Sequence, residues 1–131
     1  MEIRKFIYKD NEGEICDLSI IGDLIWRNDC NLVEIVSIPN NVERLRCYDN
    51  KITKLPEILP NNLQSLWLEN NELTSLPKPP NSLKYLSCQY NKIKQLPNLK
   101  ECEQLKEIRC DMCCFEDYML EMKNTHFIFY C

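Results

Sequence analysis

The feature that most constrains this chain is an apolar pattern that returns about every twenty residues. Three segments align as L-x-x-L-x-L-x-x-N-x-L-x-x-L-P with conservative replacements, and the second and third begin 21 and 20 residues after the one before. The aligned positions are Val42, Leu45, Cys47, Asn50, Ile52, Leu55 and Pro56, then Leu63, Leu66, Leu68, Asn71, Leu73, Leu76 and Pro77, then Leu83, Leu86, Cys88, Asn91, Ile93, Leu96 and Pro97. One such segment cannot bury its own leucines, so the pattern predicts stacked coils.

Each repeat divides into a strand, a bend and a return. The L-x-L pair alternates with period two and predicts a short strand with one buried face. The asparagine is expected to turn inward and bond backbone groups that the bend leaves unpaired. Proline lacks an N–H and disfavours helix in the residue before it, so an extended return is expected. The prolines lie at Pro39, Pro56, Pro60, Pro77, Pro79, Pro80 and Pro97.

Looser copies flank the three clear repeats. A fourth set comprises Leu105, Ile108, Cys110, Cys113 and Phe115, with a cysteine in place of the asparagine. An upstream set comprises Ile25, Cys30, Leu32 and Ile35. There Arg27 falls on an expected core position, so the register stays open, and Leu24 and Trp26 pointing inward is the alternative.

The two ends are predicted to form caps, because an open solenoid exposes its core and a sheet edge. Residues 2–9 and 14–21 alternate like strands around Asp10-Asn11-Glu12-Gly13, which predicts a hairpin. Residues 114–123 are expected to form a short helix and 125–131 a last strand. The predicted fold is a curved, right-handed, mostly β solenoid of α/β type with a parallel concave sheet. It forms one domain over 1–131, with caps at 1–21 and 119–131 and repeats over 22–118.

The sequence pattern of the repeats from Leu55-Pro56 to Leu96-Pro97 resembles the short LPX-type leucine-rich repeats of bacterial secreted effectors. It is similar also to repeat proteins of amoebae and large DNA viruses. The close match covers 42–97, with weaker cover over 22–118. The resemblance implies protein–protein recognition on the concave face. The chain has no alanine and many Asn, Ile and Lys residues, which favours an AT-rich viral or protist source.

Composition argues against several classes of function. The net charge is -4, so nothing favours nucleic acid or an anionic membrane as a partner. Two glycines and one histidine leave little for a phosphate cradle or acid–base catalysis. We therefore expect no enzyme, no catalytic residue and no cofactor. The start of the chain lacks a signal-peptide pattern, and no stretch approaches the roughly 20 apolar residues of a membrane span. We expect an intracellular, cytoplasmic protein with reduced cysteines, in a host cytoplasm or a virion.

Nine cysteines are unusually many for this length. Without an export signal, they are expected to serve as small buried hydrophobes. Cys47, Cys88 and Cys110 share one repeat position, and the last two are near enough in principle for a disulfide. Cys110 and Cys113 form a C-x-x-C, but zinc usually needs a second pair. Cys102, Cys131 and His126 could gather at that end, yet we expect no metal. Cys47-Tyr48-Asp49 spells the Cys-x-Asp of ubiquitin-ligase domains found in some of those effectors, a coincidence because Cys47 points inward.

The outward strand positions form the candidate binding surface. Arg, Trp and Tyr are enriched at binding hot spots, whereas solvation alone would favour Lys and Glu. A cation–π contact between Arg46 and Trp67 is expected. The alternative is that aromatic pairs only stabilise the sheet, by roughly 0.2–1 kcal/mol each. The candidate residues are Arg44, Arg46, Tyr48, Trp67, Glu69, Tyr85, Gln89, Tyr90 and Arg109, joined by Trp26 if the first coil keeps register.

Two functions follow. The first is a recognition module that binds an unidentified partner protein through the concave face. The second is a structural component of a large assembly, such as a minor virion protein, docked through its flanks and edges.

Overall fold

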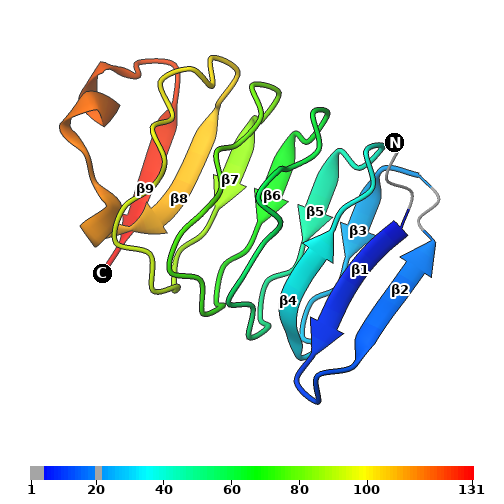
Figure 1. Ribbon diagram of the computed structural model, residues 1–131. Helices are drawn as coiled ribbons and strands as arrows, with labels where there is room; N and C mark the ends of the chain where they lie inside the picture. Colours follow the sequence, from blue (N-terminus) through cyan, green and yellow to red (C-terminus); the bar gives the residue numbers. More distant parts are fainter. Residues whose placement is uncertain (1–4, 20–21) are drawn as a thin grey trace.

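The computed structural model describes residues 5–19 and 22–131, and shows coils stacked side by side along one axis (Figure 1). Each coil contributes one strand to a parallel sheet in the order β3-β5-β6-β7-β8-β9. The predicted solenoid with a parallel sheet is therefore confirmed. Its strands are β3 (Leu24–Trp26), β5 (Arg44–Arg46), β6 (Ser65–Trp67), β7 (Tyr85–Ser87), β8 (Glu107–Asp111) and β9 (His126–Tyr130).

One column of apolar side chains runs beneath the sheet from end to end. In the parallel register, Leu45 lies opposite Leu66, which lies opposite Leu86. All three are at most 1% exposed. Ile25 extends the column at one end and Ile108 at the other. Each coil therefore hides its leucine only because its neighbours cover it, as the repeat predicts.

A second column is polar and consists of the asparagine amides. Asn71 Oδ1 accepts a hydrogen bond from the N–H of Ile52 at 3.0 Å. Its Nδ2 donates to the carbonyls of Cys47 at 3.0 Å and Leu68 at 2.9 Å. Asn50 and Asn91 make the same kinds of contact one coil away on either side. We call these three residues the asparagine ladder; it satisfies backbone groups that each bend would otherwise bury unpaired.

The segments that return from one strand to the next contain no α-helix within the described residues. Three prolines instead begin turns that lead into the strands. The carbonyls of Pro39, Pro60 and Pro80 accept the N–H groups three residues later at 3.1–3.2 Å. These returns therefore end in a tight turn directly before the next strand.

The amino-terminal end carries a second, smaller sheet. The hairpin expected there is present as β1 (Lys5–Asp10) and β2 (Ile15–Ser19), although residues 1–4, 20 and 21 lie outside the described part. The sequence did not predict that β4 (Leu32–Ser37), the return of the first coil, would pair antiparallel with β1. Fully buried Phe6 of β1 belongs to the core of the solenoid. The hairpin therefore covers the end of the core, and its pairing with residues 32–37 makes the return of the first coil a β-strand.

The carboxyl-terminal end departs from the expected single short helix. Two 3-10 helices occur instead, η1 (Met112–Cys114) and η2 (Asp117–Glu121). Neither has a side-chain hydrogen bond at its N-cap, which leaves the first N–H groups without that support. The last strand is present as β9 and pairs with β8.

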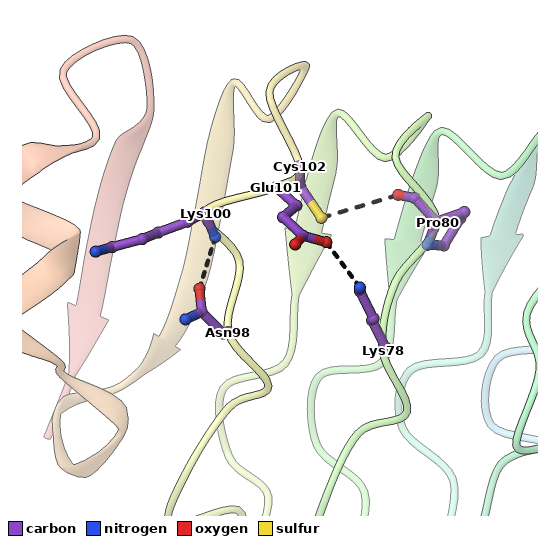
Figure 2. Close-up of polar contacts among 6 residues, drawn as sticks. All are labelled: Lys78, Pro80, Asn98, Lys100, Glu101 and Cys102. Carbon is purple, nitrogen blue, oxygen red and sulfur yellow. Dashed lines mark hydrogen bonds and ion pairs between the residues drawn. The ribbon is translucent and has the colours of Figure 1, made fainter.

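Neighbouring coils also contact one another away from the sheet (Figure 2). Lys78 Nζ lies 2.8 Å from Glu101 Oε2 in the next coil, and Cys102 Sγ lies 3.9 Å from the Pro80 carbonyl oxygen. Within one turn, the N–H of Lys100 donates to Asn98 Oδ1 at 2.9 Å. The ion pair is well exposed, so packing of the leucines, and not this contact, holds the coils together.

Candidate functional site

The outward positions of the parallel sheet form one continuous surface, which we call the concave face. The first coil joins it in register, because Ile25 is 2% exposed while Trp26 is 55% exposed. The alternative, with Trp26 turned inward, is therefore wrong. Trp26, Arg46 and Trp67 lie side by side on three adjacent strands.

The side chain of Arg46 lies between two indole rings. Its guanidinium carbon is 4.6 Å from the centroid of Trp67 and 5.4 Å from that of Trp26. The expected contact with Trp67 is confirmed, and the contact with Trp26 completes a sandwich. We call these three residues the Trp–Arg–Trp cluster. The rings fix the guanidinium in place and hold its charge near their electron-rich faces.

Arg46 differs in charge pairing from the other two arginines on this face, Arg44 and Arg109. Arg44 Nη2 lies 2.9 Å from Asp23 Oδ1, and this hydrogen bond lowers the pKa of the Asp23 carboxyl. Arg109 Nε lies 2.5 Å from Glu107 Oε1, which raises the pKa of Arg109. Within the described residues the Arg46 guanidinium has no hydrogen bond or ion pair, and its Nε is buried without a partner. Unlike Arg44 and Arg109, Arg46 therefore keeps a positive charge that no described carboxylate neutralises.

A cavity of about 50 Å³ lies beside Trp67 on the same face. Glu69 contributes a carboxylate whose Oε2 is buried and has no hydrogen-bond partner within the described residues. Burial raises the pKa of this carboxyl, because its charged form loses water. The cavity is large enough only for a group of about the size of a water molecule or two. Its lining residues are Trp67, Glu69, Tyr85, Leu86, Ser87, Glu107 and Arg109.

Not every predicted residue reaches the surface. Gln89 is only 7% exposed, and its Oε1 accepts a hydrogen bond from Ser87 Oγ at 2.8 Å. Gln89, one of the candidate residues of this surface, is therefore covered instead of exposed, because its side chain is buried and pairs with Ser87. Tyr48 is half-buried, whereas Tyr85 and Tyr90 remain exposed.

Tyr90 occupies an unusual backbone conformation. Its φ is +60°, in the left-handed region, where Asp49 and Asn70 stand at the matching bends of the two preceding coils. Asn and Asp adopt this conformation readily, and a bulky residue does so at a cost. The Tyr90 ring lies 5.4 Å from that of Tyr130, edge to face. Sequence reasoning missed Tyr130; the terminal strand was expected, but its register relative to Tyr90 was not.

Five of the nine cysteines are buried as expected, whereas Cys16 is half-buried and Cys30, Cys113 and Cys131 are exposed. All nine are free thiols, so Cys88 and Cys110 are not joined. Burial raises the pKa of Cys47 and of Cys110 to about 12, so both remain protonated at neutral pH. The cysteine of the Cys47-Tyr48-Asp49 motif is thus buried and is not a thiolate. Within the described residues no three Cys, His, Asp or Glu side chains gather as a set that could hold a metal ion.

No protein-family model matches the chain, and no curated protein matches it. Over the part of the chain that the structure describes, no helix is long and apolar enough to cross a bilayer.

Proposed function

We propose that the protein is a non-enzymatic recognition module that binds a partner protein through its concave face. The face offers exposed aromatic rings and arginines on adjacent strands, the residue types that dominate binding hot spots. Trp26 is 55% and Tyr90 54% exposed, and both rings expose apolar area that burial would stabilise.

One observation supports this function most strongly: the Arg46 guanidinium lies between two indole rings and, among the described residues, has no counter-ion. The two indoles restrict its rotamers, so little conformational entropy remains to be lost when a partner binds. Aromatic pairing alone would stabilise the sheet without any charge in the middle. An unneutralised guanidinium between two rings suits an incoming acceptor instead.

The chemistry of the face sets what the partner has to supply. A carboxylate or a row of backbone carbonyls would accept hydrogen bonds from the open edge of Arg46. A small donor group would meet the unpaired oxygen of Glu69 in the cavity beside Trp67. A partner loop that carries an acidic residue beside a donor fits both positions.

The test is affinity capture from the natural source with the double variant Arg46→Ala/Trp67→Ala. We expect a partner that the wild type retains and the double variant loses, because the cluster supplies the main contacts. The control is Ile58→Ala, which removes an 84% exposed apolar side chain outside the parallel sheet. Unchanged circular dichroism in both variants establishes that the fold is intact. Retention of every captured protein by the double variant would contradict the proposal.

The second candidate is a structural component of a larger assembly, such as a virus particle. It is favoured by exposed apolar side chains that lie away from the concave face, at Met112 (52% exposed) and Leu120 (73% exposed). In that case the captured proteins would survive Arg46→Ala/Trp67→Ala and be lost when Leu120 is replaced by a charged residue. The same capture experiment therefore separates the two functions.

A further inference from the structure

The last strand of the parallel sheet has an open side. β9 pairs with β8 and, within the described residues, with no other strand (Figure 1). It is five residues long, and its sequence, HFIFY, contains no Asp, Glu, Lys, Arg or Pro. Proteins normally protect such an edge with charges, prolines or a very short strand. None of these protections is present on β9.

The strand at the other end of the sheet is protected in the usual way. β3 spans only Leu24–Trp26 and lies between Asp23 and Arg27. A three-residue edge flanked by charges offers few hydrogen bonds and resists a neighbour. The contrast marks β9 as the edge that can accept another strand.

The hydrogen bonds of the existing pair show which backbone groups are free. The N–H of His126 donates to the carbonyl of Lys106 at 2.8 Å, so His126 directs its backbone groups toward β8. Successive residues of a strand point their backbone N–H and C=O groups to opposite sides in the plane of the sheet, so those of Ile128 and Tyr130 also point toward β8. The N–H and C=O groups of Phe127 and Phe129 therefore point to the open side.

These free groups form a self-complementary set. If two copies of β9 run antiparallel about a twofold axis at Ile128, Phe127 of one copy faces Phe129 of the other. Both residues carry outward backbone groups, so each of these two pairs exchanges both of its hydrogen bonds. Ile128 then faces its own counterpart as the closer, non-hydrogen-bonded pair. No two like charges meet anywhere in this register.

The side chains at this edge favour the same arrangement. The rings of Phe127 and Phe129 stack with centroids 5.9 Å apart, and Phe115 contacts Phe129 edge to face at 5.8 Å. Both strand phenylalanines pack against the core but remain partly exposed. A second copy would cover them with an identical aromatic pair, which continues the core across the axis.

We propose that the chain forms a twofold symmetric dimer through antiparallel pairing of β9 with β9 of a second copy, centred on Ile128. The two six-stranded sheets become one continuous sheet. An antiparallel pair of identical edges closes on itself and stops at two chains, whereas β9 adding to β3 would propagate into a filament. This dimer is independent of what the concave face binds.

Analytical ultracentrifugation over a concentration series tests the dimer. We expect the wild type to show a reversible monomer–dimer equilibrium. Ile128→Lys should raise the dimer dissociation constant about tenfold or more, because two lysines would face one another across the axis. Leu120→Lys is the control, since it adds the same charge to an exposed site at the same end of the molecule and outside β9. A monomeric wild type at every concentration, or equal effects of the two variants, would overturn the proposal.

Cross-linking tests the register. Ile128→Cys places two thiols opposite each other at the closer pair, where a disulfide can form on mild oxidation. Mass spectrometry of the digested dimer should find a peptide joined through position 128 of both chains. His126→Cys is the matched control, because position 126 faces Tyr130 of the other copy and no such link should form. A dimer without the 128–128 link, or with an equal 126–126 link, would show that another surface or register joins the chains.

Discussion

The middle coils and the carboxyl-terminal end contribute strands to the same parallel sheet but differ in how well their groups are covered. Leu45, Leu66 and Leu86 have a coil on each side and are almost fully buried. At the end, Phe115 and Leu120 stay exposed and β9 keeps one side open. The apolar side chains and backbone groups of a coil are therefore fully covered only when another coil lies on each side. The last coil has a neighbour on one side, so some of its groups stay exposed.

The bends show the same difference in polar terms. In the middle coils the asparagine ladder pairs backbone groups of its own coil and of the coil before. At the corresponding position of the last repeat stands Cys113, an exposed residue whose Sγ reaches one carbonyl, that of Ile93, at 3.4 Å. The Asn71 amide makes four hydrogen bonds to the backbone and the Cys113 thiol makes one, so the middle bends are held more tightly than the last.

The largest expected effect comes from removing a central leucine. Leu66→Ala should lower the free energy of unfolding by about 2–5 kcal/mol, because the site is closed on both sides and leaves a cavity. Leu120→Ala, at a 73% exposed position, should change it by less than about 0.5 kcal/mol. Urea denaturation followed by circular dichroism measures both. Comparable losses in the two variants would remove the distinction between middle and end.

The next effect concerns the bends. Asn71→Ala should cost about 1–3 kcal/mol, because it leaves the buried N–H of Ile52 without a partner. It also removes one of the two amide bonds to each of the Cys47 and Leu68 carbonyls, which Asn50 and Asn91 still reach. Cys113→Ala, at the matching position of the end, should cost less than about 0.5 kcal/mol. Urea denaturation of both variants measures these two losses of unfolding free energy. A small loss for Asn71→Ala would mean that water replaces the amide.

A smaller effect is expected from the buried charge of Glu69. Its pKa is raised in the folded protein, so ionisation opposes folding, and wild-type stability should fall as pH rises from below the ordinary carboxyl pKa through the raised one. Glu69→Gln removes this component and should be the more stable protein at pH 7. Thermal unfolding measured from acid to neutral pH tests the sign, with exposed Glu57→Gln as control. Greater stability of the wild type at pH 7 would contradict it.

The smallest effect is expected where the two regions meet at the surface. Lys78 in a middle coil lowers the pKa of Glu101 in the next, so the contact stabilises above the ordinary glutamate pKa and is lost as pH falls through the lowered one. Both side chains are well exposed, so Glu101→Gln should be hard to distinguish from wild type at physiological salt. A clear loss of stability at neutral pH and high salt would show that this contact joins the coils more strongly than its exposure suggests.

The repeat alone was enough to predict the middle of the molecule. The spacing of leucines such as Leu66 predicted the strands and the apolar column, because these side chains can be buried only by stacking. Asn71 predicted the hydrogen-bonded bend, and Pro80 predicted a return without a helix. The contact between Arg46 and Trp67 followed too, because parallel register fixes which residues of adjacent repeats lie side by side.

Departures from the repeat were decided by tertiary structure. Local pattern could not show that β1 would pair with β4, because antiparallel partners far apart in sequence are chosen by shared burial, as at Phe6. Nor could it show that Gln89 would be covered or that Trp26 would close the sandwich on Arg46. The sequence by itself determined the column of leucines, since periodicity dictates which side chains need cover. Only the assembled coils decided which polar groups stayed unpaired, because pairing depends on neighbours that periodicity does not specify.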